Sequence, residues 1–460
     1  MATPVILIFD VGKTNKKALL FDEQYNLVYE EASHLQETAD EDGYPCEDVN
    51  ALTAWLKSKF AEITNNPAFN VKAVNFSGYG ASFVNLGADL QPVTPLYNYL
   101  KPYPEHLKEQ FYNTYGGESV MAKHTASPVL GNLNSGMQLY RLKYERPDAF
   151  ASIKYSLHLP QYLAFVLTGE TYTDITSIGC HTGLWDYQQN TYHRWVLEEG
   201  IDKLFAPIFP SDKTIAIKDK GVVCGKGLHD SSAALVPYLA SVGEPFILLS
   251  TGTWCISLNP FNHFMLSDYE LHQDCLCYLT FQGNPVKASR LFAGYEHEQQ
   301  VKKLGEHFGV SQDYYKTVVY NPSLLDSLPN VDTTRQLDVE TAMVQQSAFG
   351  HRALHSFNSY EAAYHQLMYD IMLQQAHSLK LVLSGTAVKQ IFVDGGFGAN
   401  LIYMQLLAKA FPQLEVYAAT VGQASALGAA LAIHESWNSK PVPENIIGLR
   451  HYAAQTDVVM

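Results

Sequence analysis

Near its start the chain reads Ile6-Leu7-Ile8-Phe9-Asp10-Val11-Gly12-Lys13-Thr14-Asn15, and a second apolar run, 18–21, follows at once. Asp10 therefore stands where a buried apolar strand meets a tight turn that carries hydroxyl, amide and lysine groups. The backbone N–H groups of such a turn point outward, and Gly12 lets phosphates approach. Asp10 can reach Mg²⁺ directly or through water. The stretch is a candidate site for a metal-bound polyphosphate, although an ordinary hairpin has the same pattern.

The bulk composition indicates a soluble globular protein of two or three domains, with 460 residues, 47% hydrophobic and 17% charged. No uninterrupted apolar segment approaches 18 residues, so we expect no membrane span. The N-terminus has no basic region and no cleavage-type site, and a cytoplasmic location is the default expectation. A net charge of −15 argues against a nucleic-acid partner, which would require a basic surface.

Cysteine and histidine spacing gives little indication of a metal centre. Six cysteines in this length do not form a disulfide framework. His272, Cys275 and Cys277 form one tight group, but it lacks a second cluster at zinc spacing, so we expect buried reduced thiols. His351 and His355 have the i, i+4 spacing of helical ligands without the intervening Glu of a zinc-protease motif.

Alternating strand and helix patterns predict an α/β fold whose first sheet is partly antiparallel. The predicted strands are 5–10, 18–21, 27–31, 71–76, 246–249, 255–258 and 391–394, and the predicted helices lie around 52–60, 137–144, 161–167, 360–383 and 401–411. A break near 243 predicts two domains, 1–242 and 243–460. Residues 311–340 are polar and irregular and are expected to form a surface excursion.

Two further strand–turn units repeat the logic of the first. Ser250-Thr251-Gly252-Thr253 follows an apolar strand and offers hydroxyls and backbone N–H groups to phosphate oxygens. Asp394-Gly395-Gly396 follows another strand, so that a flat base could lie against bare backbone, with Asn400 near the next helix. A plain hairpin and close helix–strand packing are the alternatives for these two turns. Together the three units predict two similar domains that clamp a nucleotide.

The complete signatures of other nucleotide-binding classes are missing. The chain has no Gly-x-x-x-x-Gly-Lys-Ser/Thr, which argues against a P-loop NTPase. Gly78-Tyr79-Gly80 and 395–398 both fail the full Gly-x-Gly-x-x-Gly. Because Gly78-Tyr79-Gly80 follows a strand, a dinucleotide dehydrogenase stays as a weak alternative.

A candidate general base lies in the segment Gly225-Lys226-Gly227-Leu228-His229-Asp230-Ser231. Asp230 stands at a predicted helix start, followed by small residues that leave room around it. It could simply be an N-cap. It could also deprotonate a sugar hydroxyl that attacks the γ-phosphorus, since phosphoryl transfer needs mainly positioning and charge neutralisation. The two roles are compatible.

With these four pieces in order, the chain resembles the FGGY carbohydrate kinases of the actin/hexokinase/Hsp70 superfamily over nearly its whole length. Residues 10–17 resemble the family's first phosphate loop, 250–254 its second, 394–400 its adenosine-side turn and 423–430 its closing helix. Leu167-Thr168-Gly169-Glu170 and Thr173-Asp174 are similar to the middle segment, and His229-Asp230 falls on the catalytic aspartate. The resemblance implies two actin-like (ribonuclease H-like) ATPase domains with a cleft between them.

Four details of the sequence resemble kinases of 6-deoxy-ketohexoses. Rhamnulokinases and fuculokinases share the Trp of Thr251-Gly252-Thr253-Trp254 and a segment similar to 228–231. Residues 79–84 are similar to rhamnulokinases. The Thr14-Asn15 pair is similar to fuculokinases. L-Rhamnulose is therefore slightly favoured over L-fuculose. The chain departs from the family where Tyr97-Asn98-Tyr99-Leu100-Lys101 replaces Trp-x-Asp-x-Arg, which leaves the sugar open. Lys13 replaces a small residue, and Gln423 stands where Glu is common.

The resemblance implies ATP and Mg²⁺ as cofactors, with Asp230 as catalytic base and Asp10 as metal ligand. The implied cofactor-binding residues are Asp10, Gly12, Lys13, Thr14, Asn15, Lys17, Thr251, Gly252, Thr253, Gly395, Gly396 and Asn400. The implied substrate-binding residues are Tyr79, Gly80, Ala81, Tyr99, His229 and Asp230. Domain 1–242 would carry the sugar site and the base, and 243–460 most ATP contacts. The expected partner is a small sugar, with no nucleic acid or membrane, in a monomer or homodimer.

Two alternatives of other classes stay open beside this interpretation. The three nucleotide turns also suit an actin-like or Hsp70-like ATPase or a sugar-sensing regulator. Neither of these roles needs Asp230 beside a sugar loop at 79–83. A kinase of another sugar, of xylulose or ribulose type, is the alternative within the family.

Overall fold

The computed structural model describes residues 2–326, 348–421 and 423–453, and these residues form two compact units. Unit 1 comprises Met1–Ser241, Leu276–Pro285 and Gly422–Ile446, and unit 2 comprises Val242–Cys275, Val286–Val421 and Ile447–Met460. The expected domains, 1–242 and 243–460, are single segments. The structure differs because two segments from the second half of the chain group with unit 1.

Unit 1 is built on a mixed sheet with the strand order β11-β12-β6-β1-β2-β3, and β13 also pairs with β6. The strands are β1 (Thr3–Val11), β2 (Lys16–Asp22), β3 (Leu27–Ser33), β6 (Phe69–Gly78), β11 (Ile215–Ile217), β12 (Val222–Cys224) and β13 (Leu228–His229). The predicted antiparallel start is confirmed, since β1 is antiparallel to β2 and parallel to β6.

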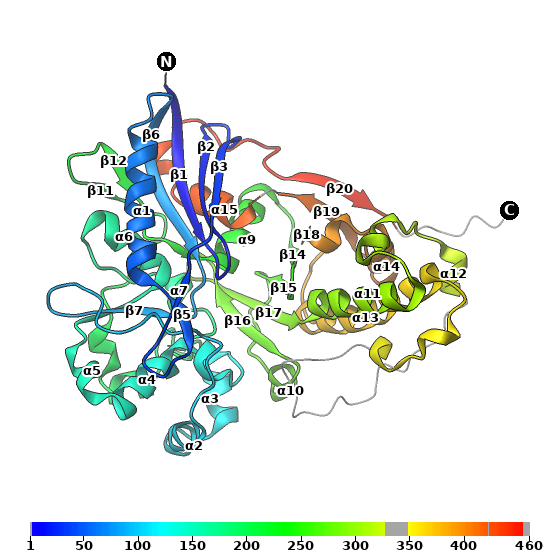
Figure 1. The fold of residues 1–460 in the computed structure, drawn as a ribbon, viewed down its shortest axis with the longest axis horizontal. Coiled ribbons are helices and arrows are strands. Elements are labelled where there is room, and N and C mark those ends of the chain that lie inside the picture. The colour runs from blue at the N-terminus through cyan, green and yellow to red at the C-terminus, as the bar shows by residue number, and fades with distance from the viewer. Residues whose placement is uncertain (1, 327–347, 422, 454–460) are drawn as a thin grey trace. The chain divides into compact units, whose positions relative to one another are not determined.

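Helices cover both faces of this sheet because its central strands are apolar on both sides. Residues 5–9 of β1 are completely buried. Figure 1 shows α1 (Val49–Thr64) and α6 (Leu159–Thr168) on one face, with α9 (Asp230–Ser241) and α15 (Ala424–Ala432) on the other. The α15 helix comes from the far end of the sequence and contacts β1, β6 and α9.

Unit 2 is built on a second mixed sheet, in which six strands have the order β17-β15-β14-β18-β19-β20. The strands are β14 (Phe246–Thr251), β15 (Cys255–Asn259), β17 (Pro285–Leu291), β18 (Gln390–Gly395), β19 (Glu415–Thr420) and β20 (Gly448–Tyr452). The helices α11 (Ala293–Phe308), α13 (Tyr360–Leu383) and α14 (Leu401–Ala410) form a core with these strands (Figure 1). The predicted helix 360–383 is confirmed at both ends.

Shorter elements complete the described chain. The remaining strands are β4 (Glu37–Ala39), β5 (Pro45–Glu47), β7 (Phe83–Leu86), β8 (Tyr155–His158), β9 (Trp185–Asp186), β10 (Thr191–Tyr192) and β16 (Cys275–Leu279). The remaining α-helices are α2 (Glu105–Thr114), α3 (Glu118–Thr125), α4 (Ser135–Glu145), α5 (Pro147–Ser152), α7 (Ile175–Ile178), α8 (Arg194–Glu198), α10 (Asp268–His272), α12 (Pro322–Asp326) and α16 (His434–Trp437).

The structure also places the histidine pair, the cysteines and the irregular segment of the sequence. His351 and His355 do not share a helix, because they lie in two separate 3₁₀ segments, Ala348–His351 and Leu354–Ser356. Cys275 and Cys277 are buried and belong to no disulfide, as expected. Within 311–340, residues 327–340 lie outside the described part, and the rest contains short helices. None of the described helices is long and apolar enough to cross a membrane.

Candidate active site

Asp10 lies one residue before the end of β1, where three other segments meet it. In the sheet it pairs with Lys17 of β2 and with Ser77 of β6. The Ser425 hydroxyl, at the start of α15, donates to Asp10 Oδ2 at 3.1 Å. The apolar residues of β1 fix the strand in the core, and its end therefore places the Asp10 carboxylate at the sheet edge.

Burial raises the pKa of Asp10 to about 6, and the nearby carboxylate of Asp230 raises it further toward that value. The hydroxyls of Ser77 and Ser425 and the charge of Lys17 act in the opposite direction. Two carboxylates are thus close enough to repel each other at this edge. Such a pair favours a cation or a shared proton.

Asp230 begins α9 and accepts a hydrogen bond from its neighbour's backbone, Ser231 N–H, at 2.6 Å. Its side chain keeps 39% of its surface exposed, yet surrounding protein atoms desolvate the carboxylate and raise its pKa to about 6. His229 Nε2 lies 3.3 Å from Asp230 Oδ1. Burial lowers the pKa of His229 to about 3, so its ring is neutral at ordinary pH.

A buried polar chain holds the segment that contains Asp230. His229 pairs with Gly78 in the sheet, and its backbone N–H donates to Thr176 Oγ1 at 2.9 Å. Asp174, which is fully buried, accepts hydrogen bonds from Thr176 N at 2.8 Å and from the Ser211 hydroxyl. The Thr173-Asp174 segment of the family resemblance therefore holds the backbone next to the candidate base through Thr176.

The loop after β6 lies directly against His229. A Cβ built on Gly80 would be 2.8 Å from His229 Cδ2 and 3.2 Å from Cys180 Sγ, so this position has no room for a side chain. Ala81 is buried as well, and its carbonyl accepts a hydrogen bond from Gln138 Nε2 at 2.7 Å. The Tyr79–Ala81 loop and the His229–Asp230 segment are thus one packed assembly.

Two tyrosines and a buried ion pair lie beside this loop. The rings of Tyr79 and Tyr99 meet edge to face with centroids 5.7 Å apart. Tyr79 OH donates to Glu47 Oε2 at 3.1 Å, and Glu47 Oε1 is 2.5 Å from Lys16 Nζ. Burial raises the pKa of Tyr99, as do the charges of Asp230 and Glu47. Tyr99 therefore presents a neutral phenol near the candidate base.

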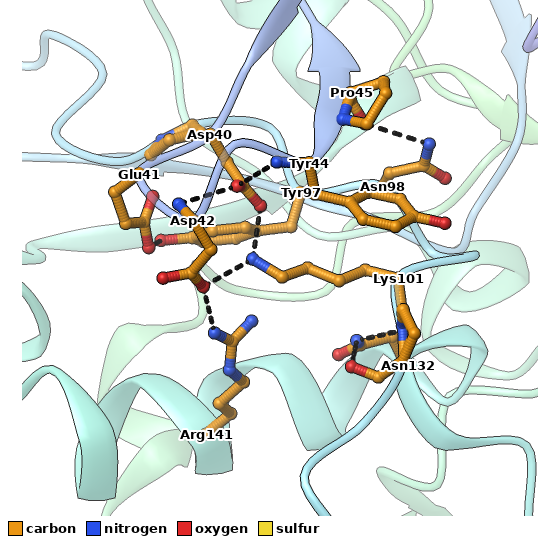
Figure 2. Close-up of polar contacts among 12 residues, drawn as sticks. Asp40, Glu41, Asp42, Tyr44, Pro45, Tyr97, Asn98, Lys101, Asn132 and Arg141 are labelled. Carbon is orange, nitrogen blue, oxygen red and sulfur yellow. Dashed lines mark hydrogen bonds and ion pairs between the residues drawn. The ribbon is translucent and has the colours of Figure 1, made fainter.

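The loop that departs from the family, 97–101, is anchored by a polar network (Figure 2). Lys101, nearly buried, pairs with Asp40 and with Asp42 Oδ2, the latter at 2.7 Å. Arg141 Nη2 binds the same Asp42 oxygen at 2.6 Å. Lys101 therefore fills a place where a longer guanidinium is usual in the family, and its two carboxylate partners come from the turn between β4 and β5.

The other end of the loop is held equally firmly. Tyr97 OH donates to Glu41 Oε1 at 2.6 Å, and the Asn98 amide donates to Pro45 O at 3.0 Å (Figure 2). Asn132 Nδ2 donates to Lys101 O at 2.7 Å. With both flanks fixed, the position of Tyr99 between them is fixed as well.

The lysines of the first turn have acidic partners. Lys13 pairs with Glu37, and Lys17 Nζ lies 3.0 Å from both Glu30 Oε1 and Gln423 Oε1. Gly12 has a negative φ, and its Cβ position meets only the Asn15 carbonyl oxygen, at 3.4 Å. Thr14 and Asn15 are exposed. The turn is thus accessible at Thr14 and Asn15.

In unit 2 the hydroxyl of Thr251 joins the two turns of that unit. It donates to Asp394 O at 2.6 Å and accepts from Phe397 N–H at 3.0 Å. Both partners are backbone groups of the third turn, so this hydroxyl fixes the second turn against the third. Gly252 and Thr253 are exposed and keep their polar groups accessible.

The third turn depends on glycine for a specific reason. Gly395 has φ +86°, and a Cβ there would lie 1.8 Å from Thr251 O. Gly396 has open space at its Cβ position, which leaves bare backbone exposed. Asn400 caps α14 by accepting from Tyr403 N–H at 3.0 Å, and its amide donates to Tyr364 OH at 2.7 Å.

The expected site residues fall into two groups, one in each unit. Unit 1 contains Asp10, Gly12, Lys13, Thr14, Asn15, Lys17, Tyr79, Gly80, Ala81, Tyr99, His229 and Asp230, and unit 2 contains Thr251, Gly252, Thr253, Gly395, Gly396 and Asn400. Sequence reasoning missed Ser77, Glu47 and Ser425 as partners of these groups. Ser77 could have been found by pairing the ends of parallel strands, whereas no local pattern marks Glu47.

Family models match almost the whole chain. The model of the FGGY family of carbohydrate kinases, N-terminal domain, matches residues 5–231, and that of carbohydrate kinase FGGY, C-terminal domain, matches residues 243–441. A rhamnulokinase from Halalkalibacterium halodurans is 23% identical over 270 residues, which are 54% of this chain and 55% of that protein. The matched region spans about half the length, or less, of the curated relatives.

Solved structures share the fold over most of the chain. A carbohydrate kinase from Novosphingobium aromaticivorans has a TM-score of 0.79 at 22% identity, covering 98% of this chain and 95% of that one. A ligand-bound xylulose kinase from Lactobacillus acidophilus has a TM-score of 0.78 at 15% identity, covering 98% and 94%. The expected α/β fold with two actin-like domains is confirmed, and the chain belongs to the FGGY family of carbohydrate kinases.

Proposed function

We propose that this chain is an ATP-dependent sugar kinase that phosphorylates a hydroxyl of a ketose, with Asp230 as general base. The observation that carries the proposal is the assembly of Asp230 with His229, the Tyr79–Ala81 loop and Asp10 in unit 1. A half-exposed carboxylate beside a neutral imidazole and a neutral phenol suits recognition and deprotonation of a hydroxyl. Family membership supports the same reaction class.

The residues at the edge of β1 fit a metal-bound nucleotide. Asp10 and Asp230 repel each other, and a divalent cation held by Asp10 would relieve that repulsion. The accessible turn 12–15 and Lys17 would contact phosphate oxygens, with Lys13 in the same turn. In unit 2, Gly252, Thr253 and the bare backbone at Gly395–Gly396 would supply further contacts. When bound, Mg·ATP supplies the phosphoryl group and neutralises its developing charge.

The candidate site residues of unit 1 have separate roles in this proposal. Asp230 accepts the hydroxyl proton at a carboxylate oxygen while that hydroxyl attacks the γ-phosphorus. His229 and Tyr99 orient the sugar, and Gly80 lets its loop pack closely against His229. Unit 1 would therefore hold the sugar and the base, and unit 2 would supply most of the ATP contacts.

For the substrate, we infer a 6-deoxy-ketohexose, with L-rhamnulose slightly favoured over L-fuculose. Two relatives of the chain are named rhamnulokinase, and they are 23% and 24% identical to it over part of their length. The phenol of Tyr99, where the family often has a carboxylate, leaves a xylulose- or ribulose-type sugar as the alternative. One of the structural relatives is itself a xylulose kinase.

A coupled ADP-release assay tests both parts of the proposal. The sugars are L-rhamnulose, L-fuculose, L- and D-xylulose, L- and D-ribulose and glycerol, each with Mg·ATP. One ketose should accelerate ADP release strongly, and Asp230→Asn should lower kcat by roughly 10²–10⁴-fold with the fold intact. Near wild-type turnover in Asp230→Asn would refute the base. ATP hydrolysis indifferent to every sugar would instead favour an actin-like or Hsp70-like ATPase.

A further inference from the structure

Three metal-ligating side chains gather beside the candidate base. Cys180 and His181 follow α7, and His229 ends β13. One ligand atom of each residue lies within 4.8 Å of the other two. The three side chains belong to residues that are 1%, 7% and 3% exposed. Thiolate and imidazole are the ligands that Zn²⁺ prefers, and three of them with an open fourth position form a common site.

The ring of His181 is oriented as metal-binding histidines are. Its Nδ1 lies 3.0 Å from the carbonyl oxygen of Leu133. Because a carbonyl can only accept, Nδ1 carries the proton of the neutral ring, and Nε2 carries the lone pair. A backbone carbonyl on the remote nitrogen is the usual partner that fixes the tautomer of a zinc-bound histidine.

His229 provides an independent indication that something binds here. Its Nδ1 is buried and has no hydrogen-bond partner within the part of the chain that the structure describes. Nε2 of the same ring faces Asp230 at 3.3 Å, a carboxylate–histidine arrangement that is also typical of metal sites. Buried ring nitrogens normally have partners, so a ligand would complete this one.

The third ligand, Cys180, lies in the same packed region. Its Sγ is 3.1 Å from Ser177 O and 3.7 Å from Gly80 O. The missing side chain at Gly80 keeps space between this sulfur and His229, since a Cβ there would approach both. On metal binding the thiol would release its proton to solvent and the sulfur would form the bond to the metal.

We propose that Cys180, His181 and His229 form a binding site for a thiolate-preferring divalent cation of the Zn²⁺ class. The bond lengths of a tetrahedral site place ligand atoms about 3.5 Å apart, so ligand atoms that now lie within 4.8 Å of one another need only a small shift of the side chains. Asp230, the exposed neighbour of the three, marks the approach from solvent. This site is distinct from the Mg·ATP site proposed at Asp10.

A second histidine cluster in unit 1 lacks these features. His124, Asp186 and His193 also place their ligand atoms together. However, His193 Nδ1 accepts from Trp195 N–H at 3.3 Å, and its Nε2 lies 3.2 Å from His124 Nδ1. Both ring nitrogens of His193 thus have protein partners. This cluster is explained by its own hydrogen bonds, and it supplies a control.

Cobalt titration of the full-length chain, freed of metal by chelation, tests the proposal without any activity measurement. The wild type should take up one Co²⁺ with a thiolate-to-cobalt charge-transfer band that Zn²⁺ displaces. Cys180→Ser should lose the band and weaken Zn²⁺ binding by more than about 100-fold. Cys46→Ser, at another buried thiol, and His193→Gln should keep both. Circular dichroism checks that each variant is folded.

Two outcomes would overturn the site. One is the absence of a thiolate band in folded wild-type protein. The other is a band that survives in Cys180→Ser, since the sulfur would then be elsewhere. His181→Gln adds a second variant, which should weaken Zn²⁺ binding even if Cys180→Ser folds poorly.

One consequence rests on the proposed function. A cation on His229 would place positive charge beside Asp230 and oppose its action as a base. Buffered Zn²⁺ should therefore inhibit wild-type turnover and inhibit Cys180→Ser at least about tenfold less strongly. If turnover depends on neither Asp230 nor sugar, the proposed function is wrong. The cobalt titration still tests the metal site, because it does not depend on turnover.

Discussion

A Cβ built on Gly428 would lie 1.8 Å from the carbonyl oxygen of Ala233, so the helices α15 and α9 touch backbone to backbone. Ser425, one turn earlier on α15, binds Asp10, and Asp230 is the first residue of α9. This single contact therefore links the two carboxylates of the candidate active site.

Replacing Gly428 by Ala should separate these helices. Overpacked cores commonly lose about 1–3 kcal/mol, and contact with rigid backbone places this change at the upper end. The serine bond to Asp10 should loosen at the same time and lower kcat. Urea unfolding and the sugar-kinase assay measure the two effects. Gly243→Ala is the control, since nothing lies within 4 Å of that Cβ position, and equal stability of both variants would contradict the prediction.

Lys101 should matter far more than a surface lysine. Replacing it by Met leaves Asp40, a fully buried carboxylate, without its cation, and breaking such a pair typically costs about 3–5 kcal/mol. Adding Asp40→Asn should recover part of that loss. Because Lys101 anchors the loop of Tyr99, the KM for sugar should rise more than kcat falls.

Chemical unfolding and steady-state kinetics check the Lys101 prediction. Lys389→Met is the matched control, because its ion pair with Glu244 is exposed and such pairs contribute about 0–1 kcal/mol. A Lys101 variant as stable as this control would show that the network in Figure 2 does not hold the loop.

Lys226 should destabilise the protein at neutral pH. It is 1% exposed, its Nζ has no hydrogen-bond partner among the described residues, and it lies 4.2 Å from the Phe209 ring centroid. Burial lowers its pKa to about 8. In the unfolded chain the lysine pKa is near 10.4, so the unfolded state binds the Lys226 proton more tightly than the folded state does. The free energy of unfolding therefore falls as the pH drops from about 10.4 to 8.

Lys226→Met should therefore raise the free energy of unfolding at pH 7 by about 1–3 kcal/mol, with the gain shrinking toward pH 10. Urea unfolding at both pH values measures this gain, with Lys218→Met, at an exposed lysine, as the control. A Met variant that is less stable at pH 7 would mean that attraction of the ammonium to the Phe209 and Tyr172 rings outweighs burial.

Thr251→Val should loosen the glycine turn of unit 2. The variant leaves Asp394 O and Phe397 N–H without their partner, at a cost of about 1–3 kcal/mol. The KM for ATP should rise as the 395–396 backbone moves, and Thr251→Ser should restore both properties. Thr253→Val, at an exposed position, is the stability control in the same unfolding experiment. Unchanged stability in Thr251→Val would contradict the linking role of the hydroxyl.

The sequence predicts local structure well where its pattern is strong. Apolar alternation and glycine predicted the strand–turn units at Asp10, Thr251 and Gly395, and an apolar stripe predicted the helix 360–383 from end to end. The sequence placed Asp230 only at a helix start, and the structure adds the short strand β13 that brings this residue to the sheet edge of Asp10.

Long-range partners could not be predicted in the same way. Nothing near Lys101 indicates that its partners are Asp40 and Asp42, because charge pairs of this kind are fixed only by the folded backbone. The same holds for Glu47 and for the two segments that join unit 1. A periodic pattern identifies a helix but not the sheet that the helix covers.

The membership of α15 in unit 1 has a consequence for how the protein is made. The ribosome releases the strands of the first sheet long before residues 422–446 are synthesised. At roughly 5–20 residues per second the interval lasts about 10–40 seconds. Throughout that time the faces of β1, β6 and α9 that α15 covers are bare, so unit 1 completes its folding only after most of unit 2 has been translated.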